Sequence, residues 1–212
     1  MLLDYVSAAL VTLLVTLDPP ALAPIFVSLT QGMTGPERRR VAVRASLIAF
    51  GILAFFGLGG EALLRLLGVG IPAFRISGGL LLFWIAFEMV FERRNDRKQN
   101  TATVAVTEDH IRNVAAFPLA IPLMAGPGAI TAVILLAGRA GGRVFYLLTL
   151  ILIIAIGVAS CLAVFLMAER VARLLGVTGN VVLSRLLGVV LAGLAVQFIV
   201  TGIESLLRSP SL

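Results

Sequence analysis

Six long apolar stretches constrain the fold of this chain more than any other feature of its sequence. They cover about residues 5–29, 41–67, 71–91, 114–137, 144–168 and 181–207. A transmembrane α-helix needs about 20 apolar residues, whereas a strand of a membrane barrel needs about ten residues of alternating polarity. The sequence therefore predicts an all-α polytopic membrane protein, with six transmembrane helices in a single membrane domain over residues 1–212.

The composition excludes several classes of protein. Of the 212 residues, 59% are hydrophobic and only 13% are charged, whereas a soluble domain is about one quarter charged. These values exclude a soluble globular enzyme, a disordered chain and a nucleic-acid-binding domain with a basic face. The net charge of +6 comes mostly from arginines in short runs between the apolar stretches. We interpret these arginines as determinants of topology and as contacts to lipid headgroups.

The distribution of the cations predicts how the chain lies in the membrane. The connections after the first, third and fifth stretches account for twelve of the seventeen cations, and the opposite side for five. Lys and Arg are enriched in cytoplasmic loops. We therefore expect both termini on the non-cytoplasmic side of the cell inner (plasma) membrane.

The sequence also repeats itself. Residues 61–69 (EALLRLLGV) recur as residues 169–177 (ERVARLLGV), and at the same offset of 108 residues Pro19 falls on Pro127. We interpret this register as an internal duplication. A three-helix unit repeated in tandem must have its second copy upside down, because three crossings leave the chain on the other side of the bilayer.

The duplication predicts the organisation of the whole chain. Repeat one covers about residues 1–91, a polar cytoplasmic loop covers residues 92–113, and repeat two covers about residues 114–212. The fold expected is thus two inverted three-helix repeats, with the first helix of each repeat broken at proline. Inverted repeats with broken helices near the bilayer midplane are typical of secondary transporters.

The break in the first stretch carries the most informative polar group. Asp18 lies near the expected bilayer centre, where a carboxylate costs several kcal/mol unless it is protonated, paired or facing water. Pro19 and Pro20 have no backbone N–H, so they leave carbonyls of the preceding turn unpaired and start a second half-helix. Its N-terminal amides are suited to a substrate carboxylate. Thr16, Asp18, Pro19, Pro20 and Ala21 are therefore candidate substrate-binding residues, with Asp18 also a candidate for proton coupling. The alternative is that Asp18 only caps the half-helix.

The break in the fourth stretch is its counterpart. Gly126 occupies the place of Asp18, Pro127 favours a helix start, and Gly128 permits close approach. Gly126, Pro127, Gly128 and Thr131 complete the candidate substrate-binding set. The alternative is a packing kink between close helices.

The remaining polar residues divide into two groups. Arg75 and Arg185 begin the third and sixth stretches, where each either reaches the membrane interface or contacts an anionic group, as in a gate. Glu88 and Glu204 lie near the ends of stretches and are expected to contact water.

Missing motifs narrow the function further. A single histidine and a single cysteine predict no metal site. The sequence contains no Walker loop and no nucleophile–base constellation, so it predicts no cofactor and no enzymatic activity.

Three segments resemble the MarC family of integral inner-membrane proteins. They are residues 18–30 (DPPALAPIFVSLT), 73–83 (AFRISGGLLLF) and 118–130 (PLAIPLMAGPGAI). In the first of them, Ala21 stands where the family's Asp-Pro-x-Gly pattern has glycine. The resemblance implies six spans in the wider group of lysine-exporter-like transporters. It also implies small neutral amino acids such as glycine and alanine as substrates.

These observations favour a secondary transporter for small solutes, with its substrate site between the broken first and fourth stretches. Small neutral amino acids are the substrates that the resemblance implies. The expected partners are a small-molecule substrate and the lipid bilayer, with no nucleic acid, and homo-oligomerisation is left open. Two alternatives remain: a non-transporting structural or accessory membrane protein, and a passive small-solute channel.

Overall fold

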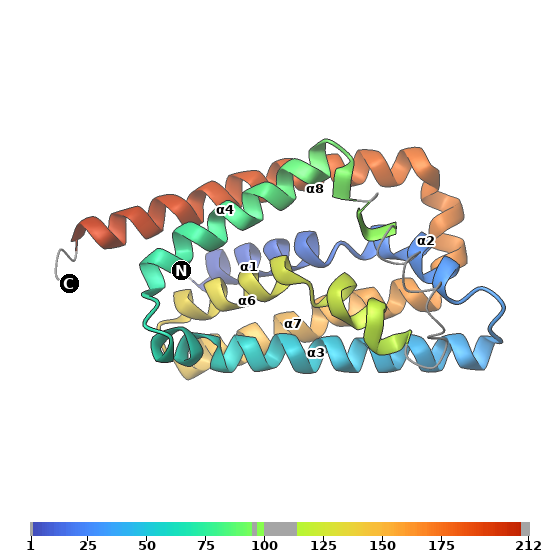
Figure 1. Ribbon diagram of the computed structural model, residues 1–212, viewed down its shortest axis with the longest axis horizontal. Helices are drawn as coiled ribbons and strands as arrows, with labels where there is room; N and C mark the ends of the chain where they lie inside the picture. Colours follow the sequence, from blue (N-terminus) through green and yellow to red (C-terminus); the bar gives the residue numbers. More distant parts are fainter. Residues whose placement is uncertain (1, 95–96, 100–113, 209–212) are drawn as a thin grey trace.

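The computed structural model describes residues 2–94, 97–99 and 114–208, and this part of the chain contains helices and no strand. The elements are α1 (Leu2–Leu17), α2 (Pro19–Leu29), α3 (Gly35–Leu66), α4 (Ile71–Val90), η1 (Ala115–Met124), α6 (Pro127–Ala140), α7 (Val144–Leu166) and α8 (Ala168–Arg208). The long helices run side by side in an elongated bundle, and both termini lie at the same end of it (Figure 1).

The helices confirm an all-α membrane protein. Within the described residues, five helical segments are long and apolar enough to cross a bilayer, with α1 and α2 together forming the first. A sixth span results if η1 and α6, which meet at an angle of 57°, are counted as one broken helix. Most of the predicted polar loop, residues 92–113, lies outside the described residues.

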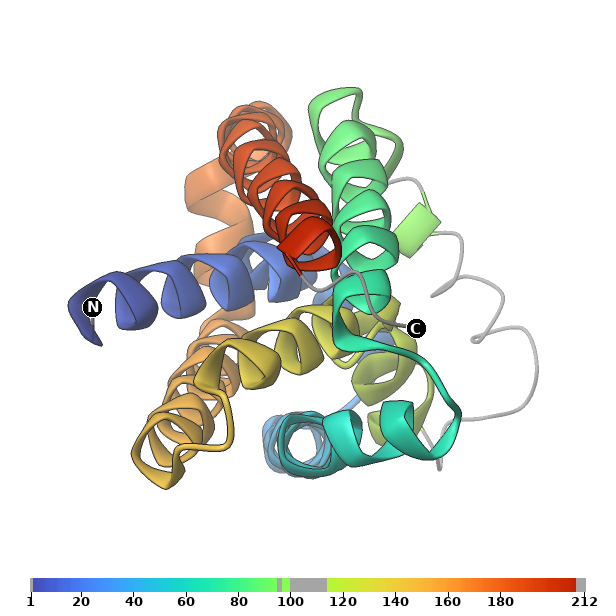
Figure 2. The same ribbon diagram turned by 90° about the vertical axis from the view of Figure 1, so that its left-hand side faces the viewer.

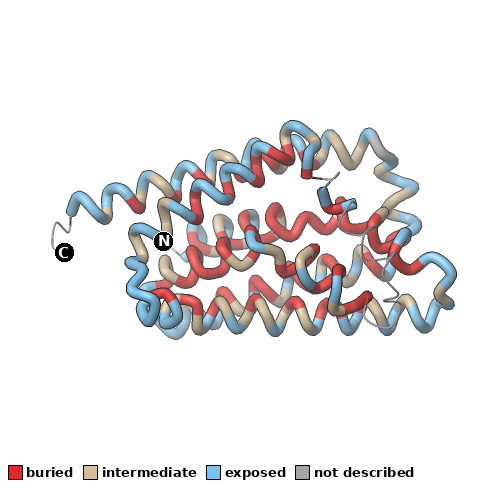
Figure 3. The backbone as a smooth tube through the Cα atoms, viewed as in Figure 1, coloured by how far each residue is buried: buried red, intermediate tan, exposed pale blue. Residues whose placement is uncertain are grey.

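Three layers make up the bundle. The helices α4 and α8 pack together on one side and α3 and α7 on the other, with α1 and α6 between them (Figures 1 and 2). Buried residues line the faces that these helices turn toward one another, whereas the outer faces are exposed (Figure 3). Large apolar side chains dominate that exterior; Phe55 on α3, for example, is 66% exposed. An apolar exterior of this extent fits a surface that faces lipid.

Glycines bring α4 and α8 into backbone contact. A methyl group added to Gly79 would lie 2.9 Å from the carbonyl oxygen of Ala195, and one added to Gly202 would lie 3.0 Å from that of Pro72. Small residues at such crossings allow the close helix packing that stabilises membrane bundles.

The repeated motif takes a similar local form in its two copies. Glu61 pairs with Arg65 at 2.6 Å near the end of α3, and Glu169 pairs with Arg173 at 3.7 Å near the start of α8. Each copy then reaches a glycine with positive φ, +71° at Gly68 and +57° at Gly176. Gly68 ends the turn after α3 and Gly176 interrupts α8. The two matching glycines are needed because L-residues with side chains rarely adopt these angles.

Candidate functional site

The first span breaks at Asp18. The helix α1 ends at Leu17 and α2 begins at Pro19, with Asp18 between them in the left-handed region at φ 54°. The Asp18 carboxylate makes no capping hydrogen bond to α2. The simple cap that the sequence left open is therefore not the role of this side chain in the structure.

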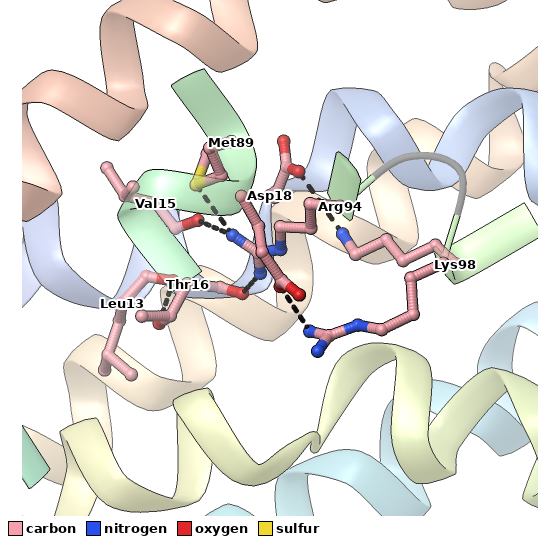
Figure 4. A network of polar contacts seen from close by, with 9 residues as sticks. Leu13, Val15, Thr16, Asp18, Met89, Arg94 and Lys98 are labelled. Carbon is pink, nitrogen blue, oxygen red and sulfur yellow. Dashed lines mark hydrogen bonds and ion pairs between the residues drawn. The ribbon is translucent and has the colours of Figure 1, made fainter. Parts of the chain in front are cut away.

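Arg94 supplies the hydrogen bonds that the two prolines remove. In an unbroken helix the carbonyls of Val15 and Thr16 would accept from the N–H groups of residues 19 and 20, but both of these residues are prolines and have no N–H. The guanidinium of Arg94 donates one hydrogen bond to the Val15 carbonyl at 3.4 Å and another to the Thr16 carbonyl at 2.5 Å (Figure 4). The carbonyls of the broken turn thus obtain their hydrogen bonds from a side chain that follows Thr16 by 78 residues in the sequence.

Lys98 pairs with Asp18 in the same interior region. The Lys98 ammonium lies 3.3 Å from a carboxylate oxygen of Asp18 (Figure 4). Asp18 is 1% exposed and Lys98 7% exposed. Burial lowers the pKa of Lys98 to about 8, although the negative charge of Asp18 acts in the opposite direction.

A second ion pair extends this network. Glu88 near the end of α4 is 6% exposed and lies 2.9 Å from the guanidinium of Arg97. We call the four buried groups Asp18, Glu88, Arg94 and Lys98, together with Arg97, whose side chain is 56% exposed, the buried charge cluster. With all five groups ionised, two negative charges face three positive ones, so the cluster has one unit of positive charge in excess.

A cavity of about 230 Å³ adjoins this cluster. Its wall contains three cations, one residue close to the first break, and Gly126 and Pro127 of the second break. The lining residues are Thr16, Leu81, Trp84, Ile85, Arg94, Arg97, Lys98, Pro122, Leu123, Met124, Gly126, Pro127, Gly128 and Ala129. The helix α6 begins at this wall, and its N-terminus adds further positive potential. Such a wall is suited to a small solute that carries an anionic group.

The glycines of the second break are tightly packed, Gly126 against backbone and Gly128 against the end of a side chain. A methyl group added to Gly126 would lie 2.5 Å from the carbonyl oxygen of Pro122, and one added to Gly128 would collide with the side chain of Ile85. The close packing expected of a kink and the lining of a cavity therefore occur together at these positions.

The structure brings together only part of the predicted site. Thr16, Gly126, Pro127 and Gly128 line the cavity, and Asp18 joins them through its pair with Lys98. Thr16 nevertheless uses its hydroxyl to bond the Thr12 carbonyl of its own helix at 2.8 Å.

The other candidates lie outside the cavity wall. Pro19 and Ala21 are buried and Pro20 is half-buried within α2, and Thr131 packs its methyl group toward Gly78 of α4.

The two candidate gating arginines also lie away from this cavity. Arg75 donates to the hydroxyl of Ser205 and to the carbonyl of Gly138, both at 3.3 Å. It therefore reaches α8 and α6 and does not simply extend to the interface. Arg185 is exposed and pairs with Glu92 at 2.8 Å.

Two expectations from the sequence were wrong. The arginines between the apolar stretches are expected to contact lipid headgroups, yet Arg94 is buried against the first span together with its neighbour Lys98, because the unpaired carbonyls and Asp18 there provide acceptors for them. Glu88 was expected to contact water, yet it is buried against Arg97. The available signal was the Asp-Pro-Pro sequence itself, since a carboxylate and two orphaned carbonyls inside a membrane require a cationic donor. Among the described residues, no group of His, Cys, Asp and Glu is arranged to hold a metal ion.

Comparison with known proteins gives a consistent assignment. Residues 3–207 match the profile described as MarC family integral membrane protein. A UPF0056 membrane protein of Aquifex aeolicus is 37% identical, with 94% of this chain and 92% of that protein aligned. The UPF0056 membrane protein YhcE of Escherichia coli is 35% identical over 89% of this chain and 87% of its own length. A UPF0056 membrane protein of Archaeoglobus fulgidus is 35% identical over 99% and 97%. These names state neither a substrate nor an enzymatic activity, and no solved structure matches the chain.

Proposed function

The chain belongs to the MarC family of integral membrane proteins, and we propose that it is a secondary transporter of small solutes, with small neutral amino acids as its substrates. One observation supports this proposal above the others. Residues beside the two proline breaks, which lie 108 residues apart in the sequence, line one cavity with a charged wall: Thr16 just before the first break, and Gly126 and Pro127 at the second. Broken helices that meet at a central site are the usual construction of a secondary transporter.

The size and charge of the cavity support this class of substrate. Its volume of about 230 Å³ is below the range of about 300–1,000 Å³ typical of sites for drug-sized ligands. A substrate carboxylate would bind between the N-terminus of α6 and the guanidinium groups of Arg94 and Arg97. A substrate ammonium group would be attracted to the carboxylate of Asp18 or Glu88.

The transport cycle would use the two halves of the chain as inverted repeats, about residues 1–91 and 114–212. The repeated motif, with its matching glycines at positions 68 and 176, supports this division. In this scheme one repeat rocks against the other and exposes the cavity alternately to the two sides of the membrane. Both termini would lie on the non-cytoplasmic side of the inner membrane.

Coupling to protons would depend on Asp18 and Lys98. A substrate ammonium group that approaches Asp18 competes with the Lys98 ammonium for the same carboxylate. Loss of a proton from Lys98 removes the charge pair and changes the affinity of the site for a zwitterion.

Transport in reconstituted vesicles tests the proposal. Vesicles that contain the protein should take up labelled glycine or alanine in a saturable manner, and Asp18→Asn should abolish this uptake while the variant remains folded. Glu204→Gln is the matched control, since Glu204 is an exposed carboxyl near the end of α8, and it should transport normally. Full activity of Asp18→Asn would remove Asp18 from the mechanism, and non-saturable flux would indicate a channel.

A further inference from the structure

The connections from α2 to α3 and from α7 to α8 lie at the end of the bundle opposite to the termini (Figure 1). Residues of these connections and of the adjoining helices line a second cavity. Its volume is about 340 Å³. The lining residues are Phe26, Val27, Gly35, Arg38, Arg39, Phe165, Leu166, Met167, Ala168, Glu169 and Arg170. None of them lines the cavity beside the buried charge cluster, so the two cavities are separate sites.

One part of this second cavity is cationic. Arg38 and Glu169 form an ion pair at 2.6 Å that joins α3 to α8, and Arg173 lies 3.7 Å from the same Glu169 carboxylate. The single acidic group of the cavity is thus neutralised by these partners. Arg39 and Arg170 are exposed and form no ion pair with the described residues. They leave two positive charges at the cavity that a ligand can neutralise.

The other part of the cavity is apolar. The rings of Phe26 and Phe165 stack with their centroids 4.7 Å apart, and Phe165 is buried. Leu166 and Met167 continue the apolar surface and are 53% and 49% exposed. The cavity therefore presents both arginines and apolar side chains to a single ligand. It lies at one end of a bundle whose apolar outer surface is suited to lipid.

We propose that this cavity binds an anionic phospholipid, with the phosphate of the headgroup between Arg39 and Arg170 and the first acyl carbons along Leu166 and Met167. Arginine recognises phosphate through two parallel hydrogen bonds, and basic pockets between transmembrane helices are suited to anionic headgroups. A free phosphate ion would use the arginines and leave the apolar wall unused. The Arg38–Glu169 pair fixes α3 against α8 beside the lipid, so the bound lipid would also stabilise this end of the bundle.

The test compares lipids on the purified full-length protein in detergent. Phosphatidylglycerol, phosphatidylcholine and inorganic phosphate are added separately, and the melting temperature and the lipid adducts in native mass spectrometry are measured. We expect phosphatidylglycerol to raise the melting temperature and to give a discrete adduct at lipid concentrations at which the other two have no effect. Equal effects of phosphatidylglycerol and phosphatidylcholine, or a phosphate effect as large as that of phosphatidylglycerol, would overturn the proposal.

Paired variants locate the site. Arg39→Gln with Arg170→Gln should weaken phosphatidylglycerol binding at least tenfold. Arg93→Gln with Arg208→Gln removes the same charge from exposed positions outside the cavity and should bind as the wild type does. Similar losses in the two double variants would show a diffuse charge effect and contradict the proposal. If the double variant Arg39→Gln with Arg170→Gln does not fold, Arg39→Lys with Arg170→Lys is tested instead, because it keeps the charge. Lysine cannot make the two parallel hydrogen bonds of arginine, so binding equal to that of the wild type would refute the arginine–phosphate contact.

Discussion

Replacement of Arg94 with methionine should destabilise the protein through the first broken span. Methionine keeps an unbranched apolar stem but removes the guanidinium that bonds to the carbonyls of Val15 and Thr16. A hydrogen bond to a charged group contributes about 1.5–3 kcal/mol, so the loss of two such bonds costs about 3–6 kcal/mol. The removal of the buried cation offsets part of this cost, because folding of the variant no longer has to desolvate the guanidinium. We expect a net loss of about 3 kcal/mol in the free energy of unfolding.

A double-mutant cycle separates this cause from others. Pro19→Ala with Pro20→Ala restores the two N–H groups that the Val15 and Thr16 carbonyls lack, so these carbonyls can be satisfied within the helix. In that background Arg94→Met should cost at least about 1.5 kcal/mol less than it does in the wild type, the value of one charged hydrogen bond.

The assay is unfolding in mixed micelles, with the helical circular dichroism signal followed during titration with a denaturing detergent. Arg93→Met is the control, because Arg93 is exposed and a surface substitution usually changes stability by less than about 0.5 kcal/mol. If the cost of Arg94→Met is the same in both backgrounds within about 0.5 kcal/mol, the sites are independent. The assignment of Arg94 to the orphaned carbonyls would then be wrong.

Two further predictions concern the cavity wall. Because burial lowers the pKa of Lys98 from 10.5 to about 8, the unfolded chain binds more protons than the folded protein between these two pH values, and the free energy of unfolding should rise with pH from about 8 to 10.5. Thermal unfolding of Lys98→Met should lack this rise. A pH profile identical to that of the wild type would contradict the lowered pKa. Gly126→Ala places a methyl group 2.5 Å from the carbonyl oxygen of Pro122 and should cost about 1–3 kcal/mol. Gly138→Ala, within α6, meets only the side chain of Ile71 at 3.4 Å. A smaller loss for Gly126→Ala than for this control would show that the turn is loosely packed.

The parts of the fold that depend on local chemistry could be predicted from the sequence. The third stretch was expected at residues 71–91, and α4 covers Ile71–Val90. Helix starts near Pro19 or Pro20 and at Pro127 are expected because proline has no N–H and fits a first turn, and the structure begins α2 at Pro19 and α6 at Pro127. Apolar length and proline chemistry can be read within a short window, so these features need no knowledge of the tertiary structure.

The parts of the site that depend on long-range pairing could not be predicted in the same way. The bond from Arg94 to Thr16 joins residues 78 positions apart, and the Lys98–Asp18 pair joins residues 80 positions apart. An arginine run after an apolar stretch has the same local appearance whether it faces lipid headgroups or folds back into the protein. Glu88 is a similar case, because a buried carboxylate needs a cation beside it, and Arg97 from outside the apolar stretch supplies one.

Protection of single cysteines by substrate tests most directly whether the two breaks form one substrate site. With the buried Cys161 replaced by alanine, Thr16→Cys and Ala129→Cys place a thiol on the cavity wall at each break, and Ser77→Cys provides an exposed control. Glycine or alanine should slow thiol labelling at positions 16 and 129 with the same half-saturating concentration as uptake, and should leave position 77 unaffected. Unchanged labelling at positions 16 and 129, at concentrations that saturate uptake, would contradict a substrate site between the two breaks.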